Sequence, residues 1–324
     1  MNTPLKLWVA GARPRTFPAA IVPVAVGTAA GYFSSGHLHV TVTAHTGVVA
    51  GAGLVHSLSI PKALLALIVA LSIQIATNYI NDYADGERGT DEVRVGPVRL
   101  VAGKLATAHD VKMAALVMFG VAALAGLVLA LMVTWWFIPL GLVCGVAGWA
   151  YTGGPHPYGY LGFGEVFVFV FFGLVATAGS AYVQHAPLSE VVQHHTYVFD
   201  YPWGFALWCG VPVGLLAAAL LQANNLRDID TDVVAGKKTL AVRLGRRKAG
   251  LLYCFTLMGV ALSIGVLHNY RSWSLLALAA LPLALLPVRL ALGDRSGKQL
   301  LPMLGSTARL QMVAGVLLTI GIFV

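Results

Sequence analysis

Nine long apolar segments dominate this sequence and limit what it can fold into. Each is roughly 17 to 24 residues long, the length that a helix needs to cross a bilayer core of about 30 Å. Lipid offers the backbone no hydrogen-bond partner, so such segments must pair their own polar groups, as helices do. The segments are 16–33, 62–80, 111–131, 133–151, 161–183, 203–223, 248–268, 273–291 and 306–324. We therefore expect an all-α fold: a polytopic membrane helical bundle of about nine transmembrane helices, forming a single domain over residues 1–324.

The composition agrees with a membrane setting. Only 10% of the residues are charged and 58% are hydrophobic, whereas a soluble domain carries about 25% charged residues. These figures exclude disordered, collagenous and coiled-coil chains. The net charge of +8 would suggest nucleic acid only if the basic residues formed a soluble face. Because they flank apolar segments, they favour orientation in the bilayer or an anionic ligand, and no nucleic-acid partner is expected.

The distribution of basic residues predicts how the bundle is oriented. Nineteen of the 21 Lys and Arg residues fall in the N-terminus and in the loops after segments two, six and eight. The exceptions are Lys62 and Arg271. Basic loops stay on the cytoplasmic side of a membrane. We expect a multi-pass protein of a bacterial plasma membrane, with its N-terminus in the cytoplasm and its C-terminus outside.

The first cluster of acidic residues lies at the end of the second apolar segment. On a helix, Asn78, Asp82 and Asp85 stand at positions i, i+4 and i+7, so one face presents an amide and two carboxylates. Acidic residues at the ends of apolar helices are costly and are usually retained for function. The cluster is therefore a candidate site.

A second cluster repeats this arrangement at the end of the sixth segment. Asn224, Asp228 and Asp232 stand at i, i+4 and i+8, on the same predicted side of the membrane as the first cluster. Together the two faces offer only oxygen ligands, which suit Mg²⁺. Basic residues that would contact a diphosphate are interleaved with them. These are Arg88, Arg94, Arg99, Lys104, Arg227 and Lys237.

These motifs resemble those of a known family. The segments Asn78–Asp91 and Asn224–Asp232 resemble the two Asp-rich motifs of the UbiA-type intramembrane prenyltransferases, which have nine helices. The resemblance covers nearly the whole chain. Further segments resemble the branch that prenylates 1,4-dihydroxy-2-naphthoate: Ala12–Pro18, Gly96–Gly103, Tyr151–Pro155, Leu161–Glu165 and Gly236–Gly245. The family pattern places a third aspartate where this chain has Gly89, and the nearest acid is Asp91.

The resemblance implies an enzyme and its reaction. Mg²⁺ held by the two Asp clusters would bind a polyprenyl diphosphate, with Asn78 and Asn224 completing the metal shell. The prenyl group would pass to 1,4-dihydroxy-2-naphthoate at a cytoplasm-facing site, with loss of pyrophosphate and CO₂, giving demethylmenaquinol for menaquinone synthesis. Arg15, Tyr151 and Glu165 are candidate contacts of the acceptor.

Two other functions are consistent with the same residues. One is a related prenyltransferase with another acceptor, such as 4-hydroxybenzoate. The other is an ion-coupled transporter, because intramembrane carboxylates also carry protons and cations. Pyrophosphate release would separate the enzymes from the transporter. The histidines His185, His194 and His195 are expected in a solvated outer loop.

Overall fold

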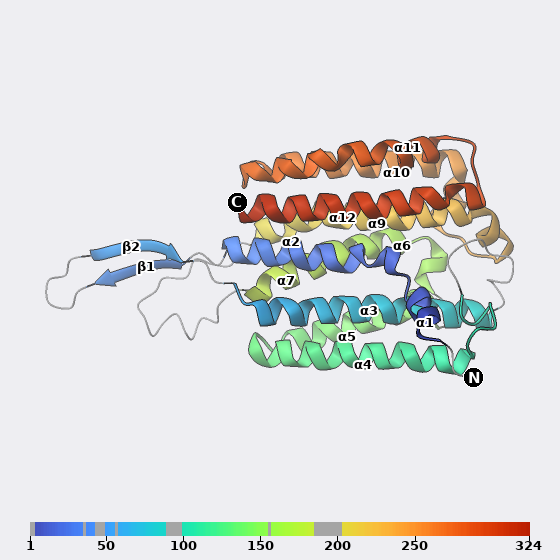
Figure 1. Cartoon of the computed structure of the whole chain (residues 1–324), viewed down its shortest axis with the longest axis horizontal. Coiled ribbons are helices and arrows are strands. Elements are labelled where there is room, and N and C mark those ends of the chain that lie inside the picture. The colour runs from blue at the N-terminus through green and yellow to red at the C-terminus, as the bar shows by residue number, and fades with distance from the viewer. Residues whose placement is uncertain are drawn as a thin grey trace.

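The structure is a computed structural model that describes residues 4–34, 37–42, 49–55, 58–88, 99–154, 157–184 and 203–324. Long helices lie side by side in a bundle, and a two-stranded hairpin projects from one end (Figure 1). The helix α1 and the last residues of α12 lie at opposite ends of the bundle (Figure 1).

The elements follow one another along the chain with short connections. The N-terminal part contains α1 (Leu5–Gly11), the 3₁₀ turn η1 (Pro14–Thr16), α2 (Pro18–Ser34), the antiparallel strands β1 (His37–Val42) and β2 (Val49–Val55), α3 (Ile60–Glu87), α4 (Ala108–Met132) and α5 (Phe137–Ala150). The middle part contains η2 (Tyr158–Leu161), α6 (Gly164–Val168), the π-helical η3 (Phe169–Val175) and α7 (Ala176–Gln184). The C-terminal part contains α9 (Trp203–Val234), α10 (Leu240–Leu267), η4 (Ser272–Ala284), α11 (Leu285–Leu292), η5 (Gly297–Leu300) and α12 (Leu301–Phe323).

The predicted helical membrane bundle is confirmed, although its number of spans is not. Within the described residues, seven helical stretches are long and apolar enough to cross a membrane. An eighth would combine residues 5–16 with α2, which meet at an angle of 56°. The segment expected at 133–151 forms α5, which has only 14 residues because the turn at Trp135 and Trp136 shortens it. The hairpin of β1 and β2 was not expected from the sequence.

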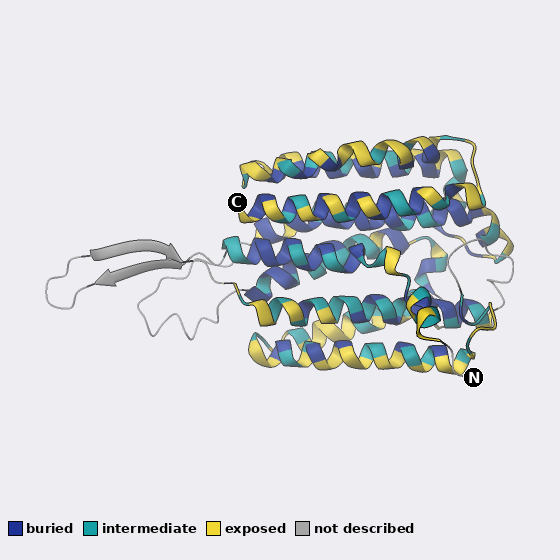
Figure 2. Ribbon diagram, in the orientation of Figure 1, coloured by how far each residue is buried: buried dark blue, intermediate teal, exposed yellow. Residues whose placement is uncertain are grey.

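The helix α9 forms the centre of the bundle and is the most buried of the candidate spans (Figure 2). It packs against α2, η3, α7, α10 and α12. At the crossing with η3 the two backbones are in contact, because a Cβ atom added to Gly173 would lie 2.5 Å from the Cα of Gly214. Small residues allow this close approach between membrane helices.

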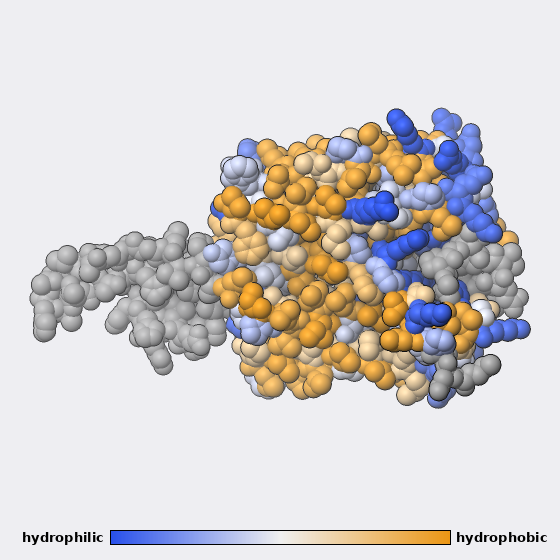
Figure 3. Space-filling model, viewed as in Figure 1, coloured by the Kyte–Doolittle hydropathy of each residue, from blue (hydrophilic) through white to orange (hydrophobic). Residues whose placement is uncertain are grey.

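The surface divides into an apolar band and a polar end. Hydrophobic side chains cover the flanks of the bundle, and hydrophilic ones gather at the end opposite the hairpin (Figure 3). Leu124, Val146 and Leu262 are each about two-thirds exposed. Apolar exposure on this scale would be unfavourable in water and is normal against lipid chains.

Candidate active site

A cavity of about 1290 Å³ lies within the bundle. Its walls come mainly from α2, α3, α4, α5, η3, α7 and α9, and most of the side chains that line them are apolar. Polar side chains contribute to the lining from the ends of the helices, among them Asn81, Arg99 and Asn224. The cavity therefore has room for a long apolar ligand and carries polar groups for one end of it.

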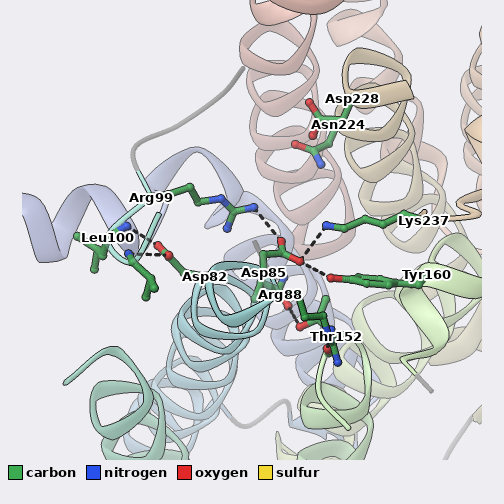
Figure 4. Close-up of polar contacts among 12 residues, drawn as sticks. Asp82, Asp85, Arg88, Arg99, Leu100, Thr152, Tyr160, Asn224, Asp228 and Lys237 are labelled. Carbon is green, nitrogen blue, oxygen red and sulfur yellow. Dashed lines mark hydrogen bonds and ion pairs between the residues drawn. The ribbon is translucent and has the colours of Figure 1, made fainter. Parts of the chain in front are cut away.

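Asp85 is the most highly connected carboxylate of the first cluster. Lys237 Nζ lies 2.8 Å from its Oδ1, Arg99 Nη2 lies 3.3 Å from its Oδ2, and the hydroxyl of Tyr160 donates to Oδ1 (Figure 4). The side chain of Asp85 is only 3% exposed. Burial, and next the Asp85 carboxylate, raise the pKa of Tyr160, so this hydroxyl keeps its proton. Residues far apart in the sequence thus converge on one carboxylate.

Asp82 faces a different part of the molecule. Its two oxygens accept hydrogen bonds from the backbone N–H groups of Leu100 (2.8 Å) and Val101 (3.1 Å), as Figure 4 shows. Three residues of an α-helix span about 300°, so Asp82 and Asp85 lie about 60° apart around the axis. In this structure Asp82 holds the turn after Arg99, whereas Asp85 faces Lys237.

The asparagines of α3 also differ from expectation. Asn78 Nδ2 donates to Ala12 O (2.8 Å) and to Thr16 Oγ1 (3.0 Å), so it anchors the N-terminal turn. Asn81 lines the cavity and accepts a hydrogen bond from the hydroxyl of Thr152. The sequence analysis missed Asn81, although it stands four residues before Asp85 and shares its helix face.

In the second cluster, an arginine joins the predicted ligands. The guanidinium of Arg227 donates to both oxygens of Asp228, at 2.6 and 2.7 Å, and to Asn224 Oδ1 at 2.7 Å. Arg227 is 1% exposed, and its buried Nη1 has no hydrogen-bond partner. Asp232 is also buried, one turn further along α9. A buried cation with an open N–H group suits an anionic ligand.

Tyr151 and Glu165 lie together at the wall formed by α6. Asn225 Nδ2 donates to Glu165 Oε1 at 3.0 Å, and the buried Oε2 of Glu165 has no hydrogen-bond partner. Tyr151 lines the cavity beside them. Burial, and next the Glu165 carboxylate, raise the pKa of the Tyr151 phenol. Asn225 was not predicted, because its neighbour Asn224 fitted the i, i+4 pattern.

The remaining candidates are placed unevenly. Arg88 donates to Thr152 O and Gly154 O, both at 2.7 Å, and so anchors the turn after α5. Lys104 is exposed in the turn after Arg99, and Arg15 is exposed at the cavity lining. Other predicted positions lie outside the described residues: Asp91, Arg94, His185, His194 and His195.

The acidic residues fit a metal ion that is shared with a substrate. Among the described residues, no three His, Cys, Asp or Glu side chains are close enough to form a metal site by themselves. Mg²⁺ is commonly held by one or two carboxylates, completed by water and substrate phosphate. The buried carboxylates of Asp85, Asp228 and Asp232, with amide oxygens beside them, supply donors of this type.

Comparison with known proteins agrees with this geometry. The model of the UbiA prenyltransferase family matches residues 19–302. A 1,4-dihydroxy-2-naphthoate octaprenyltransferase from Mycobacterium tuberculosis is 43% identical over 94% of this chain and 93% of that protein. The enzyme of the same name from Escherichia coli is 33% identical, over 98% and 94%.

Solved structures share the fold. An apo UbiA homologue from Aeropyrum pernix has a TM-score of 0.58 at 15% identity, covering 94% of this chain and 96% of that one. A UbiA homologue from Archaeoglobus fulgidus bound to DMAPP and Mg²⁺ has a TM-score of 0.54 at 15% identity, over 97% and 99%. The family match, the identities and the shared fold agree with one another, and the chain belongs to the UbiA prenyltransferase family.

Proposed function

We propose that this protein transfers a polyprenyl group from polyprenyl diphosphate to 1,4-dihydroxy-2-naphthoate, with Mg²⁺ as cofactor, releasing pyrophosphate and CO₂. The product would be demethylmenaquinol, an intermediate of menaquinone synthesis. The observation that carries the proposal is the large apolar cavity with acidic and basic residues of α3 and α9 at one end. The relatives at 43% and 33% identity, both named for this acceptor, support the choice of naphthoate.

The basic residues around the two Asp clusters would hold the diphosphate of the donor. Lys237 and Arg99 contact Asp85, and Arg227 contacts Asp228. These three cations are buried with their partner acids, so a diphosphate entering here would exchange contacts with a preformed charged network. Fixed positive groups also stabilise the charge that develops on a leaving diphosphate.

Asp85, Asp228 and Asp232 would hold Mg²⁺, with Asn81 or Asn224 beside them. When bound, the metal would offset negative charge on the departing diphosphate. We assign Asn78 and Asp82 to positioning, because their polar atoms are used by the N-terminal turn and by the loop at Leu100. This assignment narrows the set of ligands expected from the sequence.

The cavity would shield the reaction from water. The allylic C–O bond breaks as the diphosphate leaves, and the ring carbon that bears the carboxylate forms a bond to the prenyl carbon. Loss of CO₂ returns the electron pair of the broken C–C bond to the ring and restores its aromaticity. An apolar wall excludes the water that would otherwise capture the allylic cation. The prenyl tail would occupy the part of the cavity between α4, α5 and α7.

We propose nine membrane spans with the active site at the cytoplasmic face. The eight candidate spans would be joined by α5, whose 14 apolar residues extend about 21 Å. This length crosses most of the hydrocarbon core and would leave the Trp135 and Trp136 turn at the interface. The hydrophilic end in Figure 3 would then face the cytoplasm of a bacterial cell.

The test is an assay of the purified full-length protein in detergent. Polyprenyl diphosphate and 1,4-dihydroxy-2-naphthoate are added with Mg²⁺ or with EDTA, and pyrophosphate and CO₂ are measured. We expect both products in equal amounts with Mg²⁺ and neither with EDTA. Asp85→Asn should remove the activity, whereas the exposed Glu87→Gln on the same helix should keep it. Pyrophosphate without CO₂ would refute the naphthoate acceptor, and neither product from folded protein would refute the transferase.

A further inference from the structure

Arg13 has an unusual backbone conformation at the edge of the cavity. It lies between α1 and η1 with φ 56° and ψ 70°, in the left-handed region. A non-glycine residue adopts this region at some cost in free energy, and such residues persist only where the surrounding contacts hold them. The contacts around Arg13 therefore show what this strained turn is for.

The turn is held by a small network that reaches into α3. Thr16 donates to Arg13 O from both its backbone N and its Oγ1, each at 2.9 Å. Thr16 Oγ1 in turn accepts hydrogen bonds from Gln74 Nε2 (3.1 Å) and Asn78 Nδ2 (3.0 Å). Asn78 also donates to Ala12 O. Two amide side chains of a membrane helix thus fix the position of Arg13.

The guanidinium of Arg13 has two buried donors that nothing accepts. Arg13 lines the cavity, and among the described residues its buried Nε and Nη2 have no hydrogen-bond partner. By contrast, Arg99 and Lys237 contact Asp85. Buried cationic N–H groups without an acceptor are costly, so they favour a site for an anionic ligand.

The two open donors also match the shape of the ligand. Nε and Nη2 form one edge of the guanidinium plane, and two parallel N–H groups on such an edge bind the two oxygens of a carboxylate. In this protein Arg227 uses the same edge on Asp228, at 2.6 and 2.7 Å. The free edge of Arg13 therefore has the geometry of a carboxylate receptor.

The location of Arg13 separates it from the Asp clusters. Asn78, which holds the turn, precedes Asp85 by seven residues on α3, a distance of about 10 Å along the helix axis. A diphosphate held by Lys237 and Arg227 would lie at the helix ends, whereas Arg13 is anchored further into the bundle. A second anion would be needed to fill its donors.

We propose that Arg13 binds the carboxylate of the aromatic acceptor and thereby sets the position of its ring against the allylic carbon. This inference rests on the proposed function. It assigns the role expected of Arg15 to Arg13, whose guanidinium is buried, whereas Arg15 is exposed. Gln74, Asn78 and Thr16 are positioning residues for Arg13. A carboxylate held in this way stays ionised, and loss of CO₂ requires the ionised form.

The experiment compares inhibitors with and without the carboxylate on the purified full-length protein. The inhibition constants of 1-hydroxy-2-naphthoate and 1-naphthol are measured in the pyrophosphate-release assay, for wild type and Arg13→Ala. Hydrogen bonds to charged groups are worth roughly 10- to 100-fold in affinity. We expect Arg13→Ala to weaken 1-hydroxy-2-naphthoate by this factor and to change 1-naphthol and the donor KM by less than about twofold. The acceptor KM should rise with the first inhibitor.

Three variants keep the test interpretable. Lys6→Ala, an exposed cation on the neighbouring α1, should leave both inhibition constants unchanged. Arg13→Lys keeps the charge but loses the two-pronged edge, so it should lose most of the preference for the carboxylate while folding like wild type. Thr16→Val removes the hydroxyl that holds the turn, and a partial loss of the preference is expected. Melting temperatures of all variants in detergent report their folding.

Each of the other outcomes would overturn the proposal. A higher donor KM and weaker inhibition by pyrophosphate in Arg13→Ala, with the carboxylate preference intact, would assign Arg13 to the diphosphate. Loss of the preference in Arg15→Ala but not in Arg13→Ala would assign the carboxylate to Arg15. An unchanged Arg13→Lys and Arg13→Ala would remove Arg13 from the site. The absence of pyrophosphate release by the wild type would refute the proposed function instead.

Discussion

The contrast between Asp82 and Asp85 gives the sharpest test of the site. The two residues stand in the same motif, but Asp82 accepts two buried backbone N–H groups and Asp85 faces Lys237, Arg99 and Tyr160. Asp82→Asn weakens one charged hydrogen bond and turns an NH₂ group toward a backbone donor. A hydrogen bond to a charged group contributes about 1.5–3 kcal/mol. We therefore expect Asp82→Asn to lower the free energy of unfolding by about 2 kcal/mol and to keep measurable turnover.

Asp85→Asn should behave in the opposite way toward the reaction. It leaves Lys237 and Arg99 without their counter-ion and removes a proposed metal ligand. Breaking a buried ion pair from one side costs about 3–5 kcal/mol, so this variant should also be destabilised, and Lys237→Met in the same background should restore part of the loss.

The assay measures pyrophosphate release as a function of Mg²⁺ concentration, together with the melting temperature in detergent. Asp82→Asn should need the same Mg²⁺ concentration for half-maximal rate as wild type, at a lower melting temperature. Turnover by Asp85→Asn should fall at least about 100-fold at every Mg²⁺ concentration. A shifted Mg²⁺ requirement in Asp82→Asn, with an unchanged melting temperature, would refute this account and return Asp82 to the metal site.

Three further variants test other contacts. Arg88→Ala should lower kcat and leave the donor KM within about twofold, because its two hydrogen bonds at 2.7 Å hold the turn at Thr152 and Gly154; a large rise in donor KM would instead support a diphosphate contact. Gly173→Ala should destabilise the bundle by about 1–3 kcal/mol, since its Cβ would lie 2.5 Å from Gly214 Cα, whereas Gly179→Ala, with open space at its Cβ, is the matched control for thermal unfolding. Arg271→Ala should cost about 1–3 kcal/mol, because Arg271 donates twice to Ile322 O and stacks on Phe33 at 4.2 Å, and Lys62→Ala should not lower the melting temperature. An equal effect of the last pair would show that only the charge matters.

Much of the helical arrangement could be predicted, because apolar length is read directly from the sequence. The bend between α1 and α2 and the π-helix η3 could not, since they depend on packing against residues distant in the sequence. The hairpin was missed because the analysis looked for membrane-length apolar segments, and each of its strands is only six or seven residues long.

The site shows the same division. Helical spacing indicated Asp85, Asn224 and Asp228 as neighbours of the cavity end, and the structure brings basic residues to both carboxylates. Spacing could not separate Asp82 from Asp85, because what each faces depends on where the loop at Leu100 packs. The role of Arg13 was equally hidden, since backbone strain and unfilled donors are properties of the folded chain.

The exposed packing of α5 has a consequence for how this protein can evolve. The structure describes all 14 residues of α5, none of them is buried, and Leu140, Gly141 and Cys144 are among those that line the cavity. Substitutions in a weakly packed wall change the shape of the cavity at small cost to folding, and mutations with small stability costs are the ones that selection tolerates. A lineage can therefore try new side chains along α5 without first acquiring compensating changes. We expect natural variation in the length of the accepted isoprenoid to accumulate on this helix, while α9 at the centre of the bundle remains constrained.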